Sequence, residues 1–490
     1  MVRDPRLTKL LKTVRLFHPQ ADGDVIELAF DFAQQAHAGQ QRLSGEPYFT
    51  HPVAVAQITA DMGLNPTIIA AALLHDVPEE SAVTISELKK EFGVDIATIV
   101  DGVTKVGKVK YRGVDRYVEN LRKMFVAMAT DIRVIIVRFA DRLHNLQTLE
   151  YQPAHKQQRI ARESLEIYAP IANRLGMGEI KGQIEDLAFR YALPNEYRWV
   201  VGLMKHERAT REDYLESVKE RLTSELTTQG LEQFEIHGRA KHLYSFYLKL
   251  LDHERDTSKV YDLVALRIIV PSVADCYRAL GIIHQHWVPL KGRIKDYIAR
   301  PKPNGYQSLH TTVFTDDKQV VEFQIRTPEM HQQAELGVAA HWHYDEQGSF
   351  VPNKKLNWII ELAKWQKEIA DNQEYLTKLK LDVFDKRIFI FTPRGDVLDL
   401  PEHATPVDFA YAIHSDIGNH TTSAIVNDVI VPLSHLLSSG DVVEIITDKN
   451  RKSPNPDWLT FVKSSNAKNR IRLALRHDQQ GFLNRFRKKQ

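Results

Sequence analysis

The chain has 490 residues and a mass of 56.3 kDa, which suggests about three domains of ordinary size. Its 65 Lys and Arg residues nearly balance its 63 Asp and Glu residues, which argues against a protein that binds nucleic acid over its whole surface and against an acidic disordered chain. The single cysteine, Cys276, excludes an intramolecular disulfide and a zinc module of paired cysteines, and fits a reducing cytoplasm.

The first part of the chain is expected to be helical, because apolar residues recur with a period near 3.6 and alternating segments are rare. Asn65 and Pro66 form a favourable helix start, with Asn as the cap and Pro in the first turn. The apolar run that follows predicts a buried helix that ends near His75. A second buried helix is expected at 131–145, and Pro194 interrupts the helical pattern.

From about residue 200 the pattern changes to mixed α/β. The segment 320–326 alternates cleanly, with Val321, Phe323 and Ile325 on its apolar face, and therefore predicts a half-buried strand. Further strands are predicted at 266–270 and 311–314 and, after a helical stretch at 350–385, between residues 387 and 447.

Histidine and acidic residues gather on the two predicted buried helices and just before them. Two imidazoles and two carboxylates from separate helices would make a metal site that suits Mn²⁺, Fe²⁺ or Zn²⁺ better than Ca²⁺. Glu79 and Glu80 follow directly and are placed for acid–base work around a metal-bound water. The alternative is a satisfied core histidine beside a solvated acidic turn. The candidate metal ligands are His51, His75, Asp76 and Asp141.

The segments RLSGEPYFTHP, ALLHDVPEES and RFADRLHNLQTL resemble the hydrolase domain of the RelA/SpoT homologue family, the (p)ppGpp synthetase–hydrolases, and the His/Asp residues match the HD phosphohydrolase pattern. The resemblance implies that these four ligands hold a metal ion, usually manganese, and that Glu79 and Glu80 are the catalytic pair. Glu80 stands where the family usually has Asp, and Leu43 where it usually has Lys. The guanosine pocket would be lined by Arg42, Asn145 and Thr148.

A second group of charged residues surrounds two carboxylates in the mixed α/β region. Phosphoryl transfer needs such a mixture, with cations for phosphate oxygens, carboxylates for Mg²⁺ or for base work, and an aromatic ring to stack a base. Taken singly, each of these cations is equally compatible with a solvated charged surface. The carboxylates are Asp262 and Glu322, and the cations include Arg239, Lys241, Lys249, Arg293, Lys295, Arg300 and Lys302.

The runs GRAKHLYSFYLK, YDLVALRIIV, GRIKDYIARPKPNGYQSLHTTV, EFQIRT and AAHWHY resemble the synthetase domain of the same family. The resemblance implies a nucleotidyltransferase-like mixed sheet that transfers the β,γ-diphosphate of ATP to the 3′-hydroxyl of GDP or GTP. Glu322 would bind metal or act as the base, and Asp262 would hold Mg²⁺. ATP would be bound by Arg239, Lys241 and Lys249. The acceptor nucleotide would be bound by Lys295, Asn304, Tyr306, whose ring would stack the guanine, and His310.

Two further details concern this resemblance. The tetrapeptide RIKD at 293–296 has the form found in bifunctional members, in agreement with the His/Asp residues near the N-terminus. Gly182 stands where the family usually has Trp, within the helices that link the two domains, where this departure is expected to loosen the packing.

Residues 388–447 resemble the TGS module of the family, a small ubiquitin-like β-grasp. His414 lies at the position expected to read the 3′ end of tRNA; a surface histidine on a small packed domain is the alternative. The last 30 residues hold nine Lys and Arg against one Asp, so the ribosome and uncharged tRNA are candidate partners. The chain stops before the zinc-finger-like and ACT modules of long members.

We therefore expect a multidomain α and α+β protein, and the leading hypothesis is a bifunctional enzyme that makes and degrades (p)ppGpp. One alternative keeps a single activity, and another is a catalytically weak, RNA- or ribosome-binding stress sensor. No run of roughly 18 uncharged apolar residues or targeting segment is present, which predicts a cytoplasmic protein with no membrane span. The expected parts are a hydrolase domain at 1–195, a synthetase domain at 196–345, a helical linker at 346–386, a TGS domain at 387–448 and a basic helical tail at 449–490.

Overall fold

The structure is a computed structural model that divides into two compact units, Met1–Lys367 and Glu368–Gln490, which are described separately. It describes the chain except for residues 1–3, 108–113, 241, 257–263, 303, 316–318, 344–386, 395–396, 439, 449–450, 452 and 488–490. The predicted helical linker and the candidate residues Lys241 and Asp262 lie outside the described residues.

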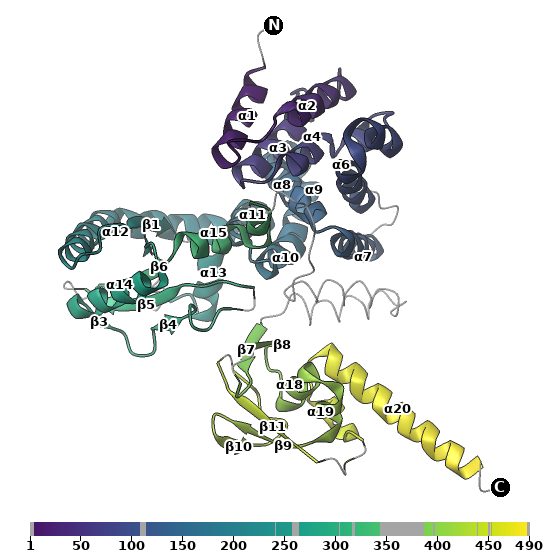
Figure 1. Cartoon of the computed structure of the whole chain (residues 1–490), viewed down its shortest axis with the longest axis vertical. Helices are drawn as coiled ribbons and strands as arrows, with labels where there is room; N and C mark the ends of the chain where they lie inside the picture. The colour runs from purple at the N-terminus through teal and green to yellow at the C-terminus, as the bar shows by residue number, and fades with distance from the viewer. Residues whose placement is uncertain are drawn as a thin grey trace. The chain divides into compact units, whose positions relative to one another are not determined.

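The first part of unit one is helical, as predicted (Figure 1). Its helices begin with α1 (Pro5–Phe17), α2 (Asp24–Ala36), α3 (Thr50–Asp61), α4 (Pro66–Leu74), α5 (Val77–Glu80), α6 (Ile85–Gly107), α7 (Val114–Thr130) and α8 (Arg133–Gln147). They continue with η1 (Leu149–Tyr151), α9 (Ala154–Glu163), the π-helical turn η2 (Ser164–Tyr168), α10 (Ala169–Arg174) and α11 (Gly178–Ala192).

Helices α4 and α8 are the two buried helices that the sequence predicted. The side chain of Asn65 accepts a hydrogen bond from the N–H of Ile68 at 3.1 Å, and Pro66 takes the first helical position. Every residue from Ile68 to Leu74 is buried, since α4 packs against α2, α3 and α6. Helix α8 begins where the carboxylate of Asp131 accepts from the N–H of Arg133 at 2.9 Å. His75, which follows α4, and Asp141, on α8, are buried, so both helices place polar side chains in the protein interior.

The helical pattern is interrupted at Pro194, as predicted, because α11 ends at Ala192 and Leu193 has non-helical dihedral angles. Pro194 then begins the longest described helix, α12 (Pro194–Thr228), where the sequence indicated mixed α/β structure from about residue 200. A proline in the first turn leaves no hydrogen bond unmade, because the N–H groups there have no intrahelical partner. The domain boundary predicted between residues 195 and 196 thus falls in the first turn of α12. This helix contributes to two hydrophobic cores, one around Phe189 and one around Phe323.

A mixed sheet follows, with the order β1-β2-β6-β5-β3 and β4 paired to β5 (Figure 1). Strands β2 and β6 are parallel, and the other pairs are antiparallel. Helices α12 and α14 cover one face of the sheet, where Val321, Phe323 and Ile325 are buried as predicted. The elements are β1 (Glu235–Ala240), α13 (Leu243–Asp252), β2 (Val264–Ile269), α14 (Val273–His286), β3 (Val288–Pro289), β4 (Lys295–Asp296), β5 (Leu309–Phe314), β6 (Val320–Arg326), α15 (Pro328–Leu336) and η4 (Gly337–His343).

Unit two holds a small α/β fold followed by a helical tail. Strand β9 pairs with β10 and β11, while β7 pairs with β8. Asp408 accepts hydrogen bonds from Thr405 and from the N–H groups of Lys463 and Ser464, which ties the tail to the fold. The elements are β7 (Arg387–Phe391), β8 (Val397–Pro401), α18 (Pro406–Ile413), α19 (Ser415–His420), β9 (Thr421–Val426), β10 (Val429–Val431), β11 (Val443–Thr447), η7 (Pro456–Thr460) and α20 (Ser465–Arg487).

Among the described residues of both units, no helix is both long enough and apolar enough to cross a membrane.

Candidate functional sites

Helices α3, α4 and α8 bring the four predicted metal ligands together in unit one. Ligand atoms of His51, His75 and Asp141 lie within 4.8 Å of one another. Asp76 closes the cluster, with its carboxylate oxygens 3.3 Å from Nε2 of His51 and 3.2 Å from Nε2 of His75. Nε2 of His51 also lies 3.3 Å from Oδ1 of Asp141. Two imidazole nitrogens and two carboxylates therefore point at one position.

The hydrogen bonding of His75 suits a metal ligand. Its Nδ1–H donates to the carbonyl of Ala72 at 2.7 Å, so Nε2 is the ring nitrogen left to bind a metal ion through its lone pair when the ring is neutral. That nitrogen is fully buried and makes no hydrogen bond to any described residue. A buried polar atom without a partner is costly, and a bound cation would satisfy it. The donor set therefore fits a divalent metal ion.

The electrostatics of the cluster favour a cation as well. Burial disfavours the charged form of Asp76, but His75, His51 and the hydroxyl of Tyr48 outweigh it and hold the pKa well below the ordinary range. For Asp141, His51 and Arg138 outweigh burial in the same way and lower the pKa. Burial opposes the charged imidazole of His51, yet the two carboxylates raise its pKa to about 9. Two ionised carboxylates are thus held in the interior, where positive charge stabilises them.

The predicted guanosine-pocket residues meet beside this cluster. The guanidinium of Arg42 donates to Oδ1 of Asn145 at 3.4 Å and to the hydroxyl of Thr148 at 3.2 Å. The amide of Asn145 in turn donates to Asp141 at 2.5 Å, so the pocket and the metal cluster share a hydrogen-bond network. Leu43, which replaces the lysine of the family, is 67% exposed and adds no polar group there.

Helix α5 carries Glu79 and Glu80 immediately after the cluster. Side-chain amide Nε2 of Gln40 donates to the backbone carbonyl of Glu80 at 2.5 Å, where the helix ends and carbonyls lack intrahelical partners. Oε1 of Gln40 accepts from Nδ1–H of His37 at 2.9 Å. The side chain of Glu80 itself is exposed. The turn that carries Glu79 and Glu80 is therefore held at its end by a residue from another segment.

Several residues around the cluster were absent from the predicted site. His37 is 2% exposed and stacks on Tyr48, whose hydroxyl donates to Asp76 at 2.8 Å. His144 meets Nδ1 of His51 with its own Nδ1 at 2.7 Å, and burial together with the charge on His51 lowers its pKa to about 3, so it is a neutral acceptor. Tyr48 lies inside the segment that carries the family resemblance, which is the signal that identifies it. Polar loop residues such as Gln40 have no periodic signal.

A second candidate site lies on the sheet face opposite the core of α12 and α14. Glu322 on β6 accepts a hydrogen bond from Nδ1 of His310 on β5 at 2.9 Å, and Nε2 of His310 accepts from the hydroxyl of Tyr306 at 2.7 Å. Burial favours the neutral carboxyl, but His310, Gln324 and Lys249 outweigh it and lower the pKa of Glu322 to about 2. Burial lowers the pKa of His310, and this effect outweighs that of Glu322, which raises it. The carboxylate is therefore ionised, and the imidazole links it to Tyr306.

The ring of Tyr306 lies among cations. The ammonium of Lys302 is 5.0 Å from the ring centroid and the guanidinium of Arg326 is 5.6 Å from it. These three residues line a cavity of about 130 Å³ together with Asn304, whose side-chain amide donates to the carbonyl of Asn173 at 3.2 Å. Lys295 is exposed on β4 and pairs with His310 in the strand register. Arg239 lies on β1 opposite Ala265, and nothing further is described of its side chain.

Gly182 on α11 lies directly under the ring of His242, which follows β1. A Cβ atom at residue 182 would come within 2.1 Å of Nε2 of His242, so no larger residue fits this arrangement. Nδ1 of His242 meets the carboxylate of Asp186 at 2.8 Å, which fixes the ring in place. The packing is therefore close at this position rather than loosened, because the histidine occupies the space that a larger side chain would need.

In unit two, His414 is the N-cap of α19, and its Nδ1 accepts from the N–H of Asp416 at 3.2 Å. Its side chain is 66% exposed. This position is compatible with contact to another molecule and equally with an ordinary surface histidine.

Residues 29–178 match the HD domain, residues 238–349 match the region found in RelA / SpoT proteins, and residues 388–447 match the TGS domain. The chain is 46% identical to a GTP pyrophosphokinase of Myxococcus xanthus over 473 residues, which cover 95% of this chain and 62% of that protein. It is 47% identical to a probable guanosine-3′,5′-bis(diphosphate) 3′-pyrophosphohydrolase of a Synechocystis species over 451 residues, which cover 91% and 59% of the two chains.

It is also 43% identical to a bifunctional (p)ppGpp synthase/hydrolase RelA of Mycobacterium tuberculosis over 479 residues, which cover 96% of this chain and 65% of that protein. The chain thus spans between 59% and 65% of the length of these curated relatives. The expected fold class is confirmed, with an HD domain, a RelA/SpoT synthetase fold and a TGS domain in one chain. With these three domains and identities above 40% over nearly all of its length, the chain belongs to the RelA/SpoT family.

Proposed function

We propose that this chain both makes and degrades the nucleotide (p)ppGpp. At the sheet site it would transfer diphosphate from ATP to the 3′-hydroxyl of GDP or GTP. At the His/Asp cluster it would hydrolyse the 3′-diphosphate to give GDP or GTP and pyrophosphate. The observation that carries the proposal is the presence, in one unit, of two separate sites with ionised carboxylates of lowered pKa, Asp76 and Asp141 in one and Glu322 in the other. The printed names of the relatives, which include a bifunctional synthase/hydrolase, support it.

In the hydrolase reaction, His51, His75, Asp76 and Asp141 would hold the metal ion, which we propose to be Mn²⁺. A bound divalent ion supplies Lewis acidity toward water and phosphate oxygens. Arg42, Asn145 and Thr148 would hold the guanosine. Glu79 and Glu80 would take the proton from the attacking water and deliver one to the leaving oxygen.

In the synthetase reaction, the 3′-oxygen of the acceptor would attack the β-phosphorus of ATP. The bond from that phosphorus to the α–β bridging oxygen would break, and AMP would leave. We assign the proton of the 3′-hydroxyl to Glu322, whose carboxylate is ionised and oriented by His310. Mg²⁺ would be held by Asp262 and would neutralise the phosphate charge, and a role for Glu322 as a metal ligand is the alternative to its role as the base.

The remaining roles concern the binding of nucleotides and RNA. Tyr306 would stack the guanine, with Lys295, Asn304 and His310 around the acceptor. ATP would be bound by Arg239, Lys241 and Lys249. We propose that the TGS domain, through His414, and the basic tail contact uncharged tRNA on the ribosome, and that the protein acts in the cytoplasm.

One experiment tests the proposal and separates it from its alternatives. The full chain is incubated with ATP, GDP and Mg²⁺ to detect ppGpp, and separately with ppGpp and Mn²⁺ to detect its loss. Both reactions are expected. One reaction alone would support a single-activity enzyme. Loss of both, with tRNA or ribosome binding retained, would support a stress sensor that is not a catalyst.

A further inference from the structure

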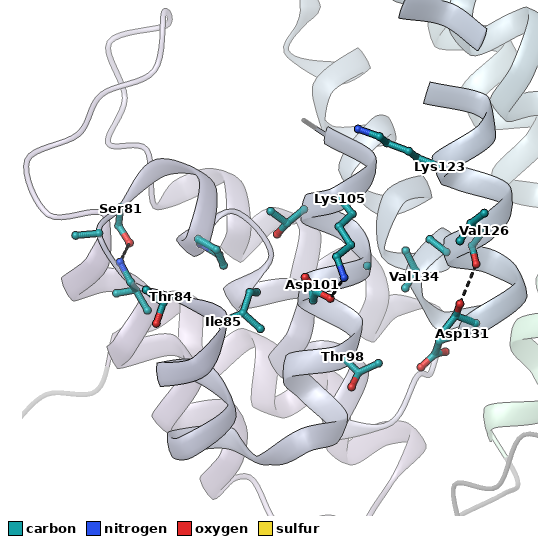
Figure 2. Close-up of a pocket in the computed structure, with 17 residues that line it drawn as sticks. Ser81, Thr84, Ile85, Thr98, Asp101, Lys105, Lys123, Val126, Asp131 and Val134 are labelled. Carbon is teal, nitrogen blue, oxygen red and sulfur yellow. Dashed lines mark hydrogen bonds and ion pairs between the residues drawn. The ribbon is translucent and has the colours of Figure 1, made fainter. Parts of the chain in front are cut away.

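A cavity of about 770 Å³ lies in the helical part of unit one, and its lining includes none of the proposed metal ligands and no residue of the sheet site (Figure 2). The segment 81–85, helices α6 and α7, and the start of α8 form its walls. Its volume is within the range of about 300–1,000 Å³ that small-molecule sites have. Much of the lining is apolar, from Val83, Ile85, Val126, Ala127 and Val134.

Every hydroxyl group that lines this cavity donates its proton in a hydrogen bond within the protein. Thr98, Thr104 and Thr130 donate to the backbone carbonyls four residues earlier, at 2.7, 2.9 and 3.0 Å. Ser81 donates to the carbonyl of Val77 at 2.7 Å, and Thr84 donates to Glu87 at 2.9 Å. A hydroxyl has one proton and two lone pairs, so such a hydroxyl can only accept from a ligand.

The acidic groups of the lining are neutralised by neighbours. Asp101 forms an ion pair with Lys105, which Figure 2 shows bent toward the carboxylate. Asp131 accepts from the guanidinium of Arg133. The cavity therefore gives a charged ligand little net attraction from these carboxylates. Ser81 and Thr84 already accept from the N–H groups of Val83 and Glu87. The cavity therefore offers apolar surface and the hydroxyl oxygens of Thr98, Thr104 and Thr130, which accept from no described residue.

We propose that this cavity binds a small uncharged molecule with an apolar body and at least one N–H donor. An apolar body gains from the removal of its surface from water, and the donor gains a partner among the threonine oxygens. A molecule of the same shape without a donor would displace water from those oxygens and offer no hydrogen bond in its place, so it would bind more weakly. Because Pro78 and Ser81 line the cavity on either side of Glu79 and Glu80, the ligand would touch the chain that continues from the catalytic turn.

The test uses N-phenyl-1-naphthylamine, a neutral probe in which one N–H joins a naphthyl and a phenyl group, and whose fluorescence rises in apolar surroundings. It is titrated into the full chain beside its N-methyl analogue, which lacks the N–H. We expect saturable binding of one probe per chain and at least about threefold weaker binding of the analogue. Equal affinity for the two probes would overturn the assigned ligand class, and absence of saturable binding would overturn the site.

Two variants locate the binding. Ala127→Trp fills the cavity and is expected to weaken the probe at least about tenfold. The triple change Thr98→Val, Thr104→Val and Thr130→Val keeps the shape, removes the acceptors, and should equalise the two probes. Thr228→Val removes an equivalent back-bonded hydroxyl on α12 and should change nothing. Unaltered probe binding by a folded Ala127→Trp protein, judged by its melting curve, would overturn the proposal. No outcome depends on either proposed catalytic activity.

Discussion

The side-chain amide of Gln40 donates to the backbone carbonyl of Glu80 at 2.5 Å, across 40 residues of sequence. The orientation of the amide is set by its other end, because Oε1 accepts from the imidazole of His37 and Nε2 must then face the carbonyl. Arg42, two residues later, reaches the guanosine-pocket residues on α8. One short loop therefore contacts both the turn that carries Glu79 and Glu80 and the predicted guanosine-pocket residues Asn145 and Thr148.

Replacing Gln40 with Glu tests this connection. The change keeps the size of the side chain but removes the donor and places a carboxylate against a carbonyl. We expect hydrolysis of ppGpp to fall about ten- to hundredfold in kcat, because a shift of roughly 1 Å in a catalytic group has an effect of that size. KM and the synthesis of ppGpp should change little.

Its control is Gln41→Glu, an identical charge change at the neighbouring exposed residue. A double-mutant cycle with Glu80→Ala shows whether Gln40 acts through Glu80. In the Glu80→Ala background, Gln40→Glu should have little further effect on hydrolysis. If Gln40→Glu lowered the hydrolysis rate by the same factor with and without Glu80→Ala, Gln40 would not act through Glu80.

The two proposed activities should be separable by single substitutions. Asp76→Asn removes a carboxylate from the metal cluster and should abolish hydrolysis while synthesis continues. Glu322→Gln removes the ionised carboxylate of the sheet site and should do the reverse. Each activity is measured in both variants. Glu232→Gln, the same change at an exposed residue, is the control for Glu322→Gln. Loss of both activities in a folded single variant would refute the assignment of two sites.

Metal binding can be measured without any reaction. An ion that binds only the folded protein stabilises it by about 2.7 kcal/mol at 100 times its dissociation constant. Mn²⁺ should therefore raise the melting temperature of the wild-type chain, and chelation should reverse the rise. Asp141→Asn should lose most of this effect, whereas Asp31→Asn on the exposed face of α2 should retain it. An equal rise in both variants would place the ion elsewhere.

Sequence patterns identified the features that repeat or that lie close together along the chain. The cap at Asn65 and the alternation of β6 needed only local rules, and both are present. Pro194 does mark a break between two helices, but the long helix α12 that it begins was not predicted, because proline suits a helix start as well as a helix end. The contact of Gly182 with His242 joins residues that are 60 positions apart in the sequence, and neither residue type predicts such a contact. Such long-range contacts depend on the packing of whole helices, which a local pattern does not encode.

The basic tail is expected to bind RNA through its exposed cations. Deletion would be a poor test, because Ala467 and Ile471 are buried against α18 and their loss would damage the fold of unit two. Changing Arg470, Arg472 and Arg476 to Gln removes three exposed charges instead. Binding to tRNA should weaken, and its salt dependence should flatten by up to about 0.9 per lost phosphate contact.

The matched control changes Lys9, Lys12 and Arg15 on α1, which are three exposed cations on a helix of unit one. If both triple variants altered the salt dependence equally, the tail would have no special role. An unchanged salt dependence in the tail variant would support a helix that only packs on its own domain.

Tyr306 offers a last test, because its ring and its hydroxyl have different partners. The ring is flanked by Lys302 and Arg326, and the hydroxyl donates to His310, which holds Glu322. Stacking of a base is worth about 1–3 kcal/mol, so Tyr306→Ala should weaken synthesis about 10- to 100-fold, mainly by raising KM for GDP. Tyr306→Phe keeps the ring and loses one hydrogen bond of about 1 kcal/mol, so it should lower kcat about fivefold with KM nearly unchanged. Tyr411→Phe, which removes a hydroxyl donor in unit two, should leave both constants as they are. Equal losses in KM from the Ala and Phe variants would show that the hydroxyl, not the ring, binds the acceptor, and the guanine would then have to stack elsewhere.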